Sequence, residues 1–204
     1  MMIRSFNLIP LLVILITNLS NVTAQDDKWN LKKNRDDIII YTRANTITGL
    51  VEFKAITIVE TTIDNLLNVF KDVEGYTKWM SDTNVSKTLK KINHNEQYIY
   101  LEFEVPWPLE NRDIPIYQKI NRTDNFTKIS LIGKPNYLPP KKGFTRVQKS
   151  IGSWEFIPLQ SNRIKIIYKY MGDPGINMPS WIINLFIVEG PFKTLSNLKV
   201  ILEL

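Results

Sequence analysis

Two polar side chains interrupt an otherwise apolar strand face, and they are the first candidates for chemistry in this sequence. The segment from Asp113 to Arg122 alternates in character, so that one side of it carries Arg112, Ile114, Ile116, Gln118 and Ile120. A buried guanidinium or amide needs a hydrogen-bond partner, either in the protein or on a bound molecule. The sequence therefore leaves two roles open for Arg112 and Gln118, namely contact with a ligand and a structural hydrogen bond.

Residues that could catalyse a reaction are few. The chain has no cysteine, and its one histidine, His94, lies in the polar turn Ile92-Asn93-His94-Asn95-Glu96. No Ser-His-Asp set can be assembled around such a turn, and clustered histidine, cysteine or carboxylate ligands of a metal site are lacking. We therefore predict no catalytic residue, no metal and no cofactor.

A stiff apolar loop separates two of the predicted strands. In Val105-Pro106-Trp107-Pro108-Leu109, two prolines prevent regular strand pairing and place Trp107 and Leu109 on the loop. An apolar loop tip is costly in water unless it docks on another surface. Trp107 and Leu109 are thus candidates for a contact with another surface.

One principal helix is predicted at the end of the chain. From Ser180 to Leu204, apolar residues recur at every third or fourth position, among them Trp181 and Leu185. Pro179 suits its first turn and Ser180 is a possible N-cap. Gly190-Pro191 interrupts the pattern, and because proline removes a backbone donor we expect a kink there.

The remainder of the chain is predicted to consist mostly of strands. We expect a short helix from Lys28 to Asp36, a compact helix from Thr62 to Lys71 and an apolar turn from Val73 to Met80. Alternation and turn signals place the strands at Ile38 to Arg43, Val51 to Glu60, Ser86 to Ile92, Gln97 to Val105, Asp113 to Arg122, Phe126 to Gly133, Gly143 to Pro158 and Arg163 to Met171. Hairpin-sized turns imply an antiparallel sheet, so the fold class is α+β.

The first 24 residues have the pattern of a secretory signal peptide. Arg4 precedes the apolar run from Leu8 to Ile16, and Val22-Thr23-Ala24 supplies small residues for cleavage before Gln25. This run is shorter than the roughly 20 apolar residues of a membrane span. We expect an exported protein, periplasmic or extracellular, in which residues 25–204 form a single domain.

The positive charge of the chain is modest and dispersed. The net charge is +6, and the basic doublets Lys32-Lys33, Lys90-Lys91 and Lys141-Lys142 are far apart in the sequence. A nucleic-acid-binding protein concentrates such charge in a patch or stripe, so nucleic acid is not expected as a partner. A weak attraction to anionic lipid surfaces is the most that this charge implies.

Several short motifs, taken in order, resemble those of the START family of lipid transfer domains. The proline-flanked Asn111-Arg112-Asp113 is similar to that family's Asn-Arg-Asp segment, and Trp154 with Gly152 and Pro158 resembles its Gly-x-Trp strand. The family's entry to the C-terminal helix is similar to a third set of residues here, namely Asp173-Pro174-Gly175, Pro179, Trp181 and Asn184. The likeness runs from about Trp29 to Leu204.

The resemblance implies a helix-grip fold, in which a curved antiparallel sheet wraps around the long C-terminal helix. One lipid would lie in an internal hydrophobic tunnel, in a protein that acts as a monomer. The residues implied to contact this ligand are Leu101, Phe103, Arg112, Asp113, Ile114, Ile116, Gln118, Trp181 and Leu185. The implied gate consists of Trp107, Leu109 and Met178, which would touch a membrane surface transiently during transfer.

Two departures from the family pattern bear on the choice of lipid. Members that carry phosphatidylcholine surround the choline with aromatic residues, which fits cation recognition, whereas this chain has Leu101, Ile114 and Ile116 at matching positions. Sterol-carrying members have a second arginine where this chain has Gln118. These differences argue against a choline cage and against a charged sterol clamp. The identity of the lipid stays open, as does a direct ligand contact of the Arg-Asp pair.

Two other classes of function also stay open. Related helix-grip folds include cyclases and hydrolases, in which a carboxylate or tyrosine of the cavity would do acid-base work on a hydrophobic substrate. A partner-binding domain without a ligand would have filled strand faces, whereas the small Ala55 on an inward face suggests open space. A carrier of one hydrophobic molecule is the function that the sequence favours.

Overall fold

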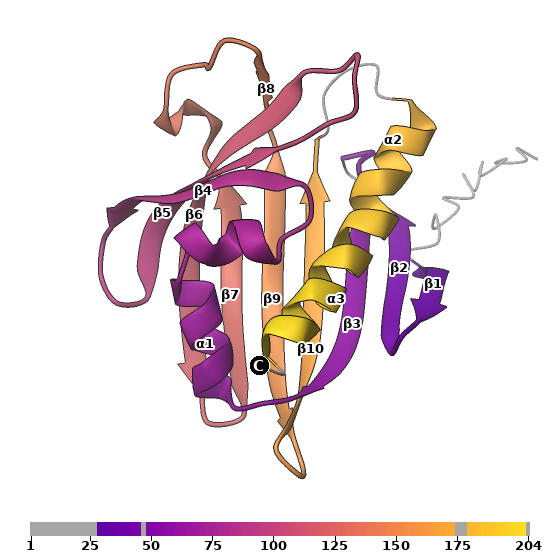
Figure 1. Cartoon of the computed structure of the whole chain (residues 1–204), viewed down its shortest axis with the longest axis vertical. Helices are drawn as coiled ribbons and strands as arrows, with labels where there is room; N and C mark the ends of the chain where they lie inside the picture. Colours follow the sequence, from indigo (N-terminus) through magenta and orange to yellow (C-terminus); the bar gives the residue numbers. More distant parts are fainter. Residues whose placement is uncertain (1–27, 46–47, 174–178, 203–204) are drawn as a thin grey trace, which may run out of the picture.

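The computed structural model describes residues 28–45, 48–173 and 179–202, which form one curved sheet with helices against its inner face (Figure 1). The strand order is β1-β2-β3-β10-β9-β7-β6-β5-β4, every pair on this path is antiparallel, and β8 pairs in parallel with β6. The strands are β1 (Asn30–Arg35), β2 (Ile38–Ala44), β3 (Val51–Glu60), β4 (Thr83–Lys91), β5 (Glu96–Phe103), β6 (Asn111–Thr123), β7 (Phe126–Gly133), β8 (Phe144–Arg146), β9 (Ser150–Leu159) and β10 (Arg163–Gly172).

The C-terminal helix crosses the inner face of the sheet in front of β9, β10 and β3 (Figure 1). It consists of α2 (Ser180–Asn184), a π-helical turn η3 (Leu185–Glu189) and α3 (Gly190–Leu202). The other helices are α1 (Ile63–Lys71) and the 3₁₀ turns η1 (Glu74–Lys78) and η2 (Pro135–Tyr137). This arrangement confirms the predicted α+β fold, with a curved antiparallel sheet around a C-terminal helix.

The compact helix expected after β3 is present, and its first turn is capped locally. Thr62 is the N-cap of α1, and its hydroxyl accepts a hydrogen bond of 3.2 Å from the Asn65 N–H. Leu66, Leu67 and Phe70 are the buried residues of α1. Their three- and four-residue spacing turns one face of the helix toward the sheet.

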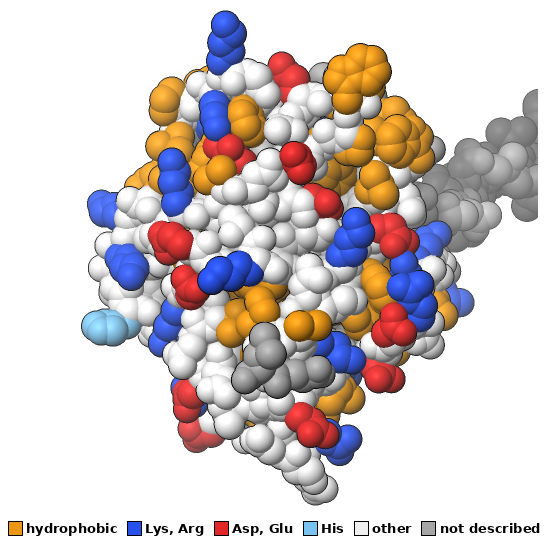
Figure 2. All heavy atoms as spheres, viewed as in Figure 1, with side chains coloured by type: hydrophobic (Ala, Val, Ile, Leu, Met, Phe, Trp, Pro, Cys, Tyr) orange, Lys and Arg blue, Asp and Glu red, His pale blue; other side chains and the backbone are white. Residues whose placement is uncertain are grey.

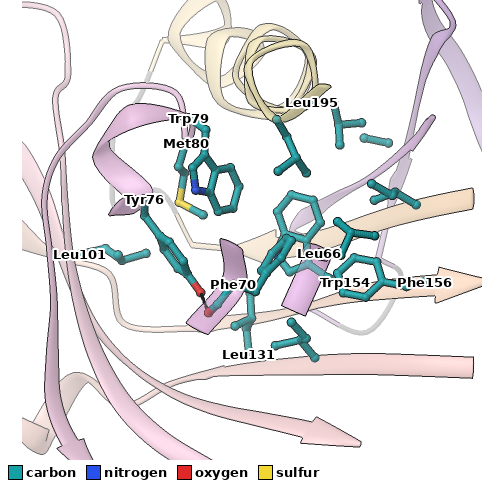
Figure 3. Close-up of a cluster of buried hydrophobic side chains, with 14 of the residues drawn as sticks. Leu66, Phe70, Tyr76, Trp79, Met80, Leu101, Leu131, Trp154, Phe156 and Leu195 are labelled. Carbon is teal, nitrogen blue, oxygen red and sulfur yellow. Dashed lines mark hydrogen bonds between the residues drawn. The ribbon is translucent and has the colours of Figure 1, made fainter. Parts of the chain in front are cut away.

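A cluster of aromatic side chains from separate elements lies within the core (Figure 3). Phe70 of α1 meets Trp79, Trp154 and Phe156 with ring centroids 4.9 to 5.2 Å apart, mostly edge to face. Leu195 of α3 is fully buried and points into this cluster. Such aromatic contacts bury large apolar areas and prefer edge-to-face geometry, so the cluster fixes α1 and α3 on the sheet.

The helix expected from Lys28 to Asp36 is wrong, because this segment forms β1 and pairs with β2 in a hairpin. Asp36 and Asp37 form its two-residue turn with φ of 53° and 59°. A two-residue hairpin turn of this kind needs positive φ at both positions, which aspartate tolerates better than most residues. The hairpin register therefore overrides a weak helical pattern.

The C-terminal helix remains helical from Ser180 to Leu202, with the π turn directly before the Gly190-Pro191 step at which a kink was expected. Pro191 has no N–H to donate to the Ile187 carbonyl, and the backbone adapts through the π turn, in which the Gly190 N–H donates to the Leu185 carbonyl. Pro179 rather than Ser180 is the N-cap of α2. Another difference is that the single strand expected from Gly143 to Pro158 is divided into β8 and β9. Within the described ranges, no helix is long and apolar enough to cross a membrane.

Candidate functional site

A cavity of about 260 Å³ lies between the inner face of the sheet and the C-terminal helix. Its sheet wall includes Phe53, Leu101, Phe103, Ile116 and Leu131. The volume is just below the range of about 300 to 1,000 Å³ usual for small-molecule pockets. The cavity is therefore an apolar compartment suited to a hydrocarbon chain or ring system.

The helix side of the cavity is formed around the π turn. Phe186 and Ile187 of η3 line it, together with Ile183 of α2 and Pro191 of α3. Glu189 of the same turn forms an ion pair of 2.6 Å with Lys33 of β1. The π turn η3 thus supplies side chains that cover the cavity. The same turn is held to the β1–β2 hairpin by the Glu189–Lys33 ion pair.

Two tyrosines of β10 form one wall of the cavity. Tyr168 stacks on its cross-strand neighbour Trp154 with ring centroids 3.7 Å apart and planes 5° apart. Tyr170 lies over Gly152, where an added Cβ would sit 2.8 Å from its ring and 3.0 Å from a backbone oxygen. The pair Gly152 and Trp154 therefore has a physical role, since the glycine makes room for one tyrosine and the tryptophan supports the other.

Polar groups of the cavity wall come from segments near the ends of its strands and from α3. Ser81, Asp82, Arg112, Asp173 and Thr194 are lining residues. The Ser81 N–H donates to the Thr194 hydroxyl at 3.1 Å, which ties the segment after η1 to α3. Arg112 donates from Nη1 to the Glu110 carbonyl, and burial lowers the pKa of its guanidinium. These residues supply the charged and hydrogen-bonding groups that a ligand could meet.

The proline-rich loop between β5 and β6 lies at the same end of the molecule as α2 (Figure 1). Trp107 is 90% exposed at this loop, whereas Leu109 is partly buried. The loop is held at its base by a hydrogen bond of 3.1 Å from the Val105 N–H to the Asn111 side chain. Met178, the third predicted gate residue, lies outside the described residues.

Four of the nine predicted ligand contacts line the cavity. They are Leu101, Phe103, Arg112 and Ile116. Trp181 is 57% exposed and Leu185 is partly buried, and neither belongs to the lining. Ile114 is fully buried in the core, also outside the lining. The cavity wall therefore contains fewer of these residues than the sequence predicted.

Gln118 has protein partners for its side chain. Its amide nitrogen donates to the Tyr76 hydroxyl at 3.2 Å, and its amide oxygen accepts from Gln97 at 3.1 Å. Gln118 is 1% exposed and does not line the cavity. The sequence left open whether Gln118 contacts a ligand or forms a hydrogen bond within the protein, and the structure shows hydrogen bonds within the protein.

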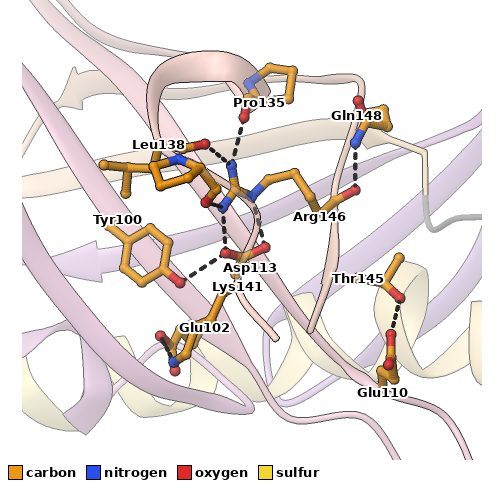
Figure 4. Close-up of polar contacts among 11 residues, drawn as sticks. Tyr100, Glu102, Glu110, Asp113, Pro135, Leu138, Lys141, Thr145, Arg146 and Gln148 are labelled. Carbon is orange, nitrogen blue, oxygen red and sulfur yellow. Dashed lines mark hydrogen bonds and ion pairs between the residues drawn. The ribbon is translucent and has the colours of Figure 1, made fainter. Parts of the chain in front are cut away.

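Asp113 lies on the other face of the sheet, in a buried polar cluster with Arg146 and Tyr100 (Figure 4). Both Asp113 carboxylate oxygens accept hydrogen bonds of 2.8 Å from Arg146, and the Tyr100 hydroxyl donates to one of them at 2.9 Å. Arg146 also donates to the carbonyls of Pro135 and Leu138. Asp113 therefore anchors the segment that follows β7, and its contacts are architectural.

Tyr168, Tyr170, Phe53 and Ile187 are lining residues that the sequence reasoning did not name. The two tyrosines share the parity of Ile164 and Ile166 in an alternating strand, so their inward direction was readable from the sequence. Phe53 was readable in the same way. The place of Ile187 depends on the π turn, which the sequence does not signal.

Comparison with known proteins places this chain in a family. The family model described as START domain matches residues 17–203. This chain belongs to the START-domain family. The match begins within the predicted signal peptide and continues through the C-terminal helix.

Relatives of this START domain include proteins named for lipid transfer. The phosphatidylcholine transfer protein of Rattus norvegicus is 29% identical over 163 residues, covering 76% of this chain and 75% of that protein. A STAR-related lipid transfer protein from Xanthomonas axonopodis superposes with a TM-score of 0.79 at 31% identity, covering 87% of this chain and all of that one. Human StAR-related lipid transfer protein 5 has a TM-score of 0.76 at 14% identity, covering 88% of each chain, and supports the fold alone.

One buried and two partly buried tyrosines lead us to predict that this START domain loses stability at alkaline pH. Burial raises the pKa of Tyr76, Tyr168 and Tyr170 above the usual value of about 10. Above about pH 10 the unfolded chain releases these protons while the folded chain keeps them, so each should lower the free energy of unfolding by about 1.4 kcal/mol per pH unit. Below that pH their contribution is constant.

Urea unfolding at pH 8 and pH 11 measures this effect. The Tyr168→Phe variant should lose less stability between the two pH values than the wild type does. Equal losses in the variant and the wild type would show that Tyr168 ionises equally in both states.

Proposed function

We propose that this START domain binds one lipid or other hydrophobic small molecule in its internal cavity and carries it between membranes. The observation that supports this function best is the apolar cavity between the sheet and the π turn of the C-terminal helix. The relatives named as phosphatidylcholine transfer proteins support the same class of activity. The proposed cycle is opening at a membrane, uptake of the lipid and closure around it.

In this proposal, the affinity comes from burial of the ligand's hydrocarbon chain. Each methylene that leaves water contributes about 0.8 kcal/mol, so eight methylenes would contribute about 6 kcal/mol before ordering costs. Polar groups of the lining, such as Arg112, Asp82 and Asp173, would then determine which ligand is bound. This division of roles suits a carrier, which must bind tightly but also release its cargo.

A carrier is favoured over the cyclase or hydrolase alternative. His94 lies exposed in the turn between β4 and β5, and no group of three histidine, cysteine or acidic residues that could hold a metal occurs in the described parts of the chain. The named relatives are transfer proteins.

The end of the molecule that carries α2 and the β5–β6 loop is the proposed membrane-contact surface. Figure 2 shows hydrophobic side chains gathered there, and Trp107 and Trp181 are 90% and 57% exposed. Tryptophan is favoured at the boundary between water and lipid, where its ring sits at the level of the headgroups. Insertion of this surface would bring the cavity next to the membrane.

Replacement of Trp107 with aspartate tests the membrane contact and the carrier function together. The variant should transfer fluorescent phosphatidylcholine between donor and acceptor vesicles at least fivefold more slowly, because a charge replaces the inserting ring. Its melting temperature should be almost unchanged, since Trp107 is 90% exposed. Ile92→Asp, at an exposed apolar residue in the β4–β5 turn, is the matched control and should transfer at the wild-type rate. Equal rates for the two variants would contradict a membrane contact at Trp107.

We also propose that the protein is exported, with cleavage between Ala24 and Gln25. The charged start, apolar run and small cleavage residues of the sequence support this location. The segment itself lies outside the described residues. N-terminal sequencing of the protein isolated from the periplasm or medium should begin at Gln25, and a mature chain that begins at Met1 would contradict export by this route.

A further inference from the structure

The hydroxyl of Tyr168 is a polar group with no partner in the wall of the cavity. Tyr168 lies on the inner face of β10, stacked on Trp154 and with the ring of Phe53 at its edge, 4.9 Å between centroids. No hydrogen bond reaches its hydroxyl from the described residues. The buried side-chain atoms without a partner in this part of the chain are the hydroxyls of Thr61 and Ser86. The Tyr168 hydroxyl is therefore not sealed in the core, and its accessible surface opens onto the cavity that the residue lines.

The hydroxyls of two other tyrosines donate hydrogen bonds to protein acceptors. Tyr76 donates to the Phe70 carbonyl at 2.6 Å, and Tyr100 donates to the Asp113 carboxylate at 2.9 Å. The side chain of Tyr170, two residues along the same face as Tyr168, has the Ser150 side chain close enough to act on its pKa. The Tyr168 hydroxyl has no partner among the described residues and faces the cavity that the residue lines, so it is available to a molecule bound there.

The chemistry of this group defines what it would recognise. Burial raises the pKa of Tyr168, so its hydroxyl stays protonated and acts as a hydrogen-bond donor. The surrounding wall is apolar, with Phe53 and Leu131 among its residues. A suitable ligand therefore has an isolated acceptor oxygen attached to hydrocarbon. In glycerophospholipids this is the carbonyl of an acyl ester, whereas the oxygen of an alkyl ether is a weaker acceptor.

We propose that Tyr168 donates a hydrogen bond to an ester carbonyl of the bound lipid, so that the cavity selects ester-linked acyl lipids over ether-linked alkyl lipids. This inference rests on the proposed carrier function and adds the class of lipid. It also assigns the selectivity to a single atom, which a tyrosine-to-phenylalanine change removes while the stacked ring remains.

A competition between two matched lipids tests this proposal. The full-length protein is incubated with vesicles that hold equal amounts of diacyl and dialkyl phosphatidylcholine of the same chain length. Native mass spectrometry then gives the ratio of the two lipids bound to the protein. The wild type should favour the diacyl lipid by about two- to tenfold, the effect of one net hydrogen bond. In Tyr168→Phe the ratio should fall to about one. Tyr98→Phe, on the outer face of the sheet, is the matched control and should keep the wild-type ratio.

The outcomes separate this inference from the carrier function. Equal loading of the two lipids by the wild type, or a preference that survives in Tyr168→Phe, would overturn the ester contact while leaving the carrier intact. Loss of the preference in Tyr170→Phe alone would assign the selectivity to the other hydroxyl and overturn the role of Tyr168. A wild-type protein that takes up neither lipid would contradict the carrier function for phospholipids and this inference with it.

Discussion

Replacement of Arg146 with methionine should lower the free energy of unfolding by about 3 to 5 kcal/mol, the usual cost of removing one partner of a buried ion pair. Asp113 is fully buried, and Arg146 supplies donors to both of its carboxylate oxygens. Without the guanidinium, the carboxylate is left with the Tyr100 hydroxyl as its remaining side-chain donor in the described structure. Urea unfolding at pH 7 measures the loss.

The control variant is Arg163→Met, which removes the same charge at an exposed position of β10. It should change the free energy of unfolding by no more than about 0.5 kcal/mol. The double variant Arg146→Met with Asp113→Asn should recover part of the loss, because the unpaired charge is then absent. A loss in Arg146→Met no larger than in the control would mean that the pair does not hold the segment after β7 in place.

The second large effect is expected from filling the cavity. In Ile116→Trp the larger ring should occupy the space of about two methylenes of a bound chain, which costs about 1.6 kcal/mol, or roughly a fifteenfold loss of affinity. Ile116 is a lining residue on the inner face of β6. Lipid uptake from vesicles, measured by the amount of lipid per protein, reports the loss.

Ile132→Trp is the matched control, because Ile132 is 40% exposed on the outer face of β7. It introduces the same ring into the same sheet and should leave uptake unchanged. The free energy of unfolding of Ile116→Trp should lie within about 1 to 3 kcal/mol of the wild type, the usual cost of overpacking. Wild-type uptake by a folded Ile116→Trp protein would place the lipid elsewhere.

The sequence predicts the sheet and the C-terminal helix because both follow simple periods. Alternation in β3, β5 and β10 and the three-and-four spacing after Ser180 are sufficient for these elements. The β1 hairpin was missed, since its turn depends on positive φ at Asp36 and Asp37 rather than on an apolar pattern. Periodic burial is thus readable from sequence, whereas a local backbone exception is not.

The candidate site is only partly readable for a related reason. Strand parity placed Leu101, Phe103 and Ile116 correctly on the inner face. The same parity holds for Gln118, which lies inward but is bound to Tyr76 outside the cavity. Parity gives the direction of a side chain, but the extent of a cavity along the strand depends on what packs above it. The role of Asp113 was equally hidden, because its partner Arg146 is 33 residues away.

Native mass spectrometry of the protein isolated from its own cells tests the central claim most directly. The account predicts one lipid per protein, released and identified after denaturation, in the wild type and in the Ile132→Trp control, and a much smaller amount in Ile116→Trp. A wild-type protein that carries no lipid and takes up none from vesicles would contradict a carrier function for this cavity.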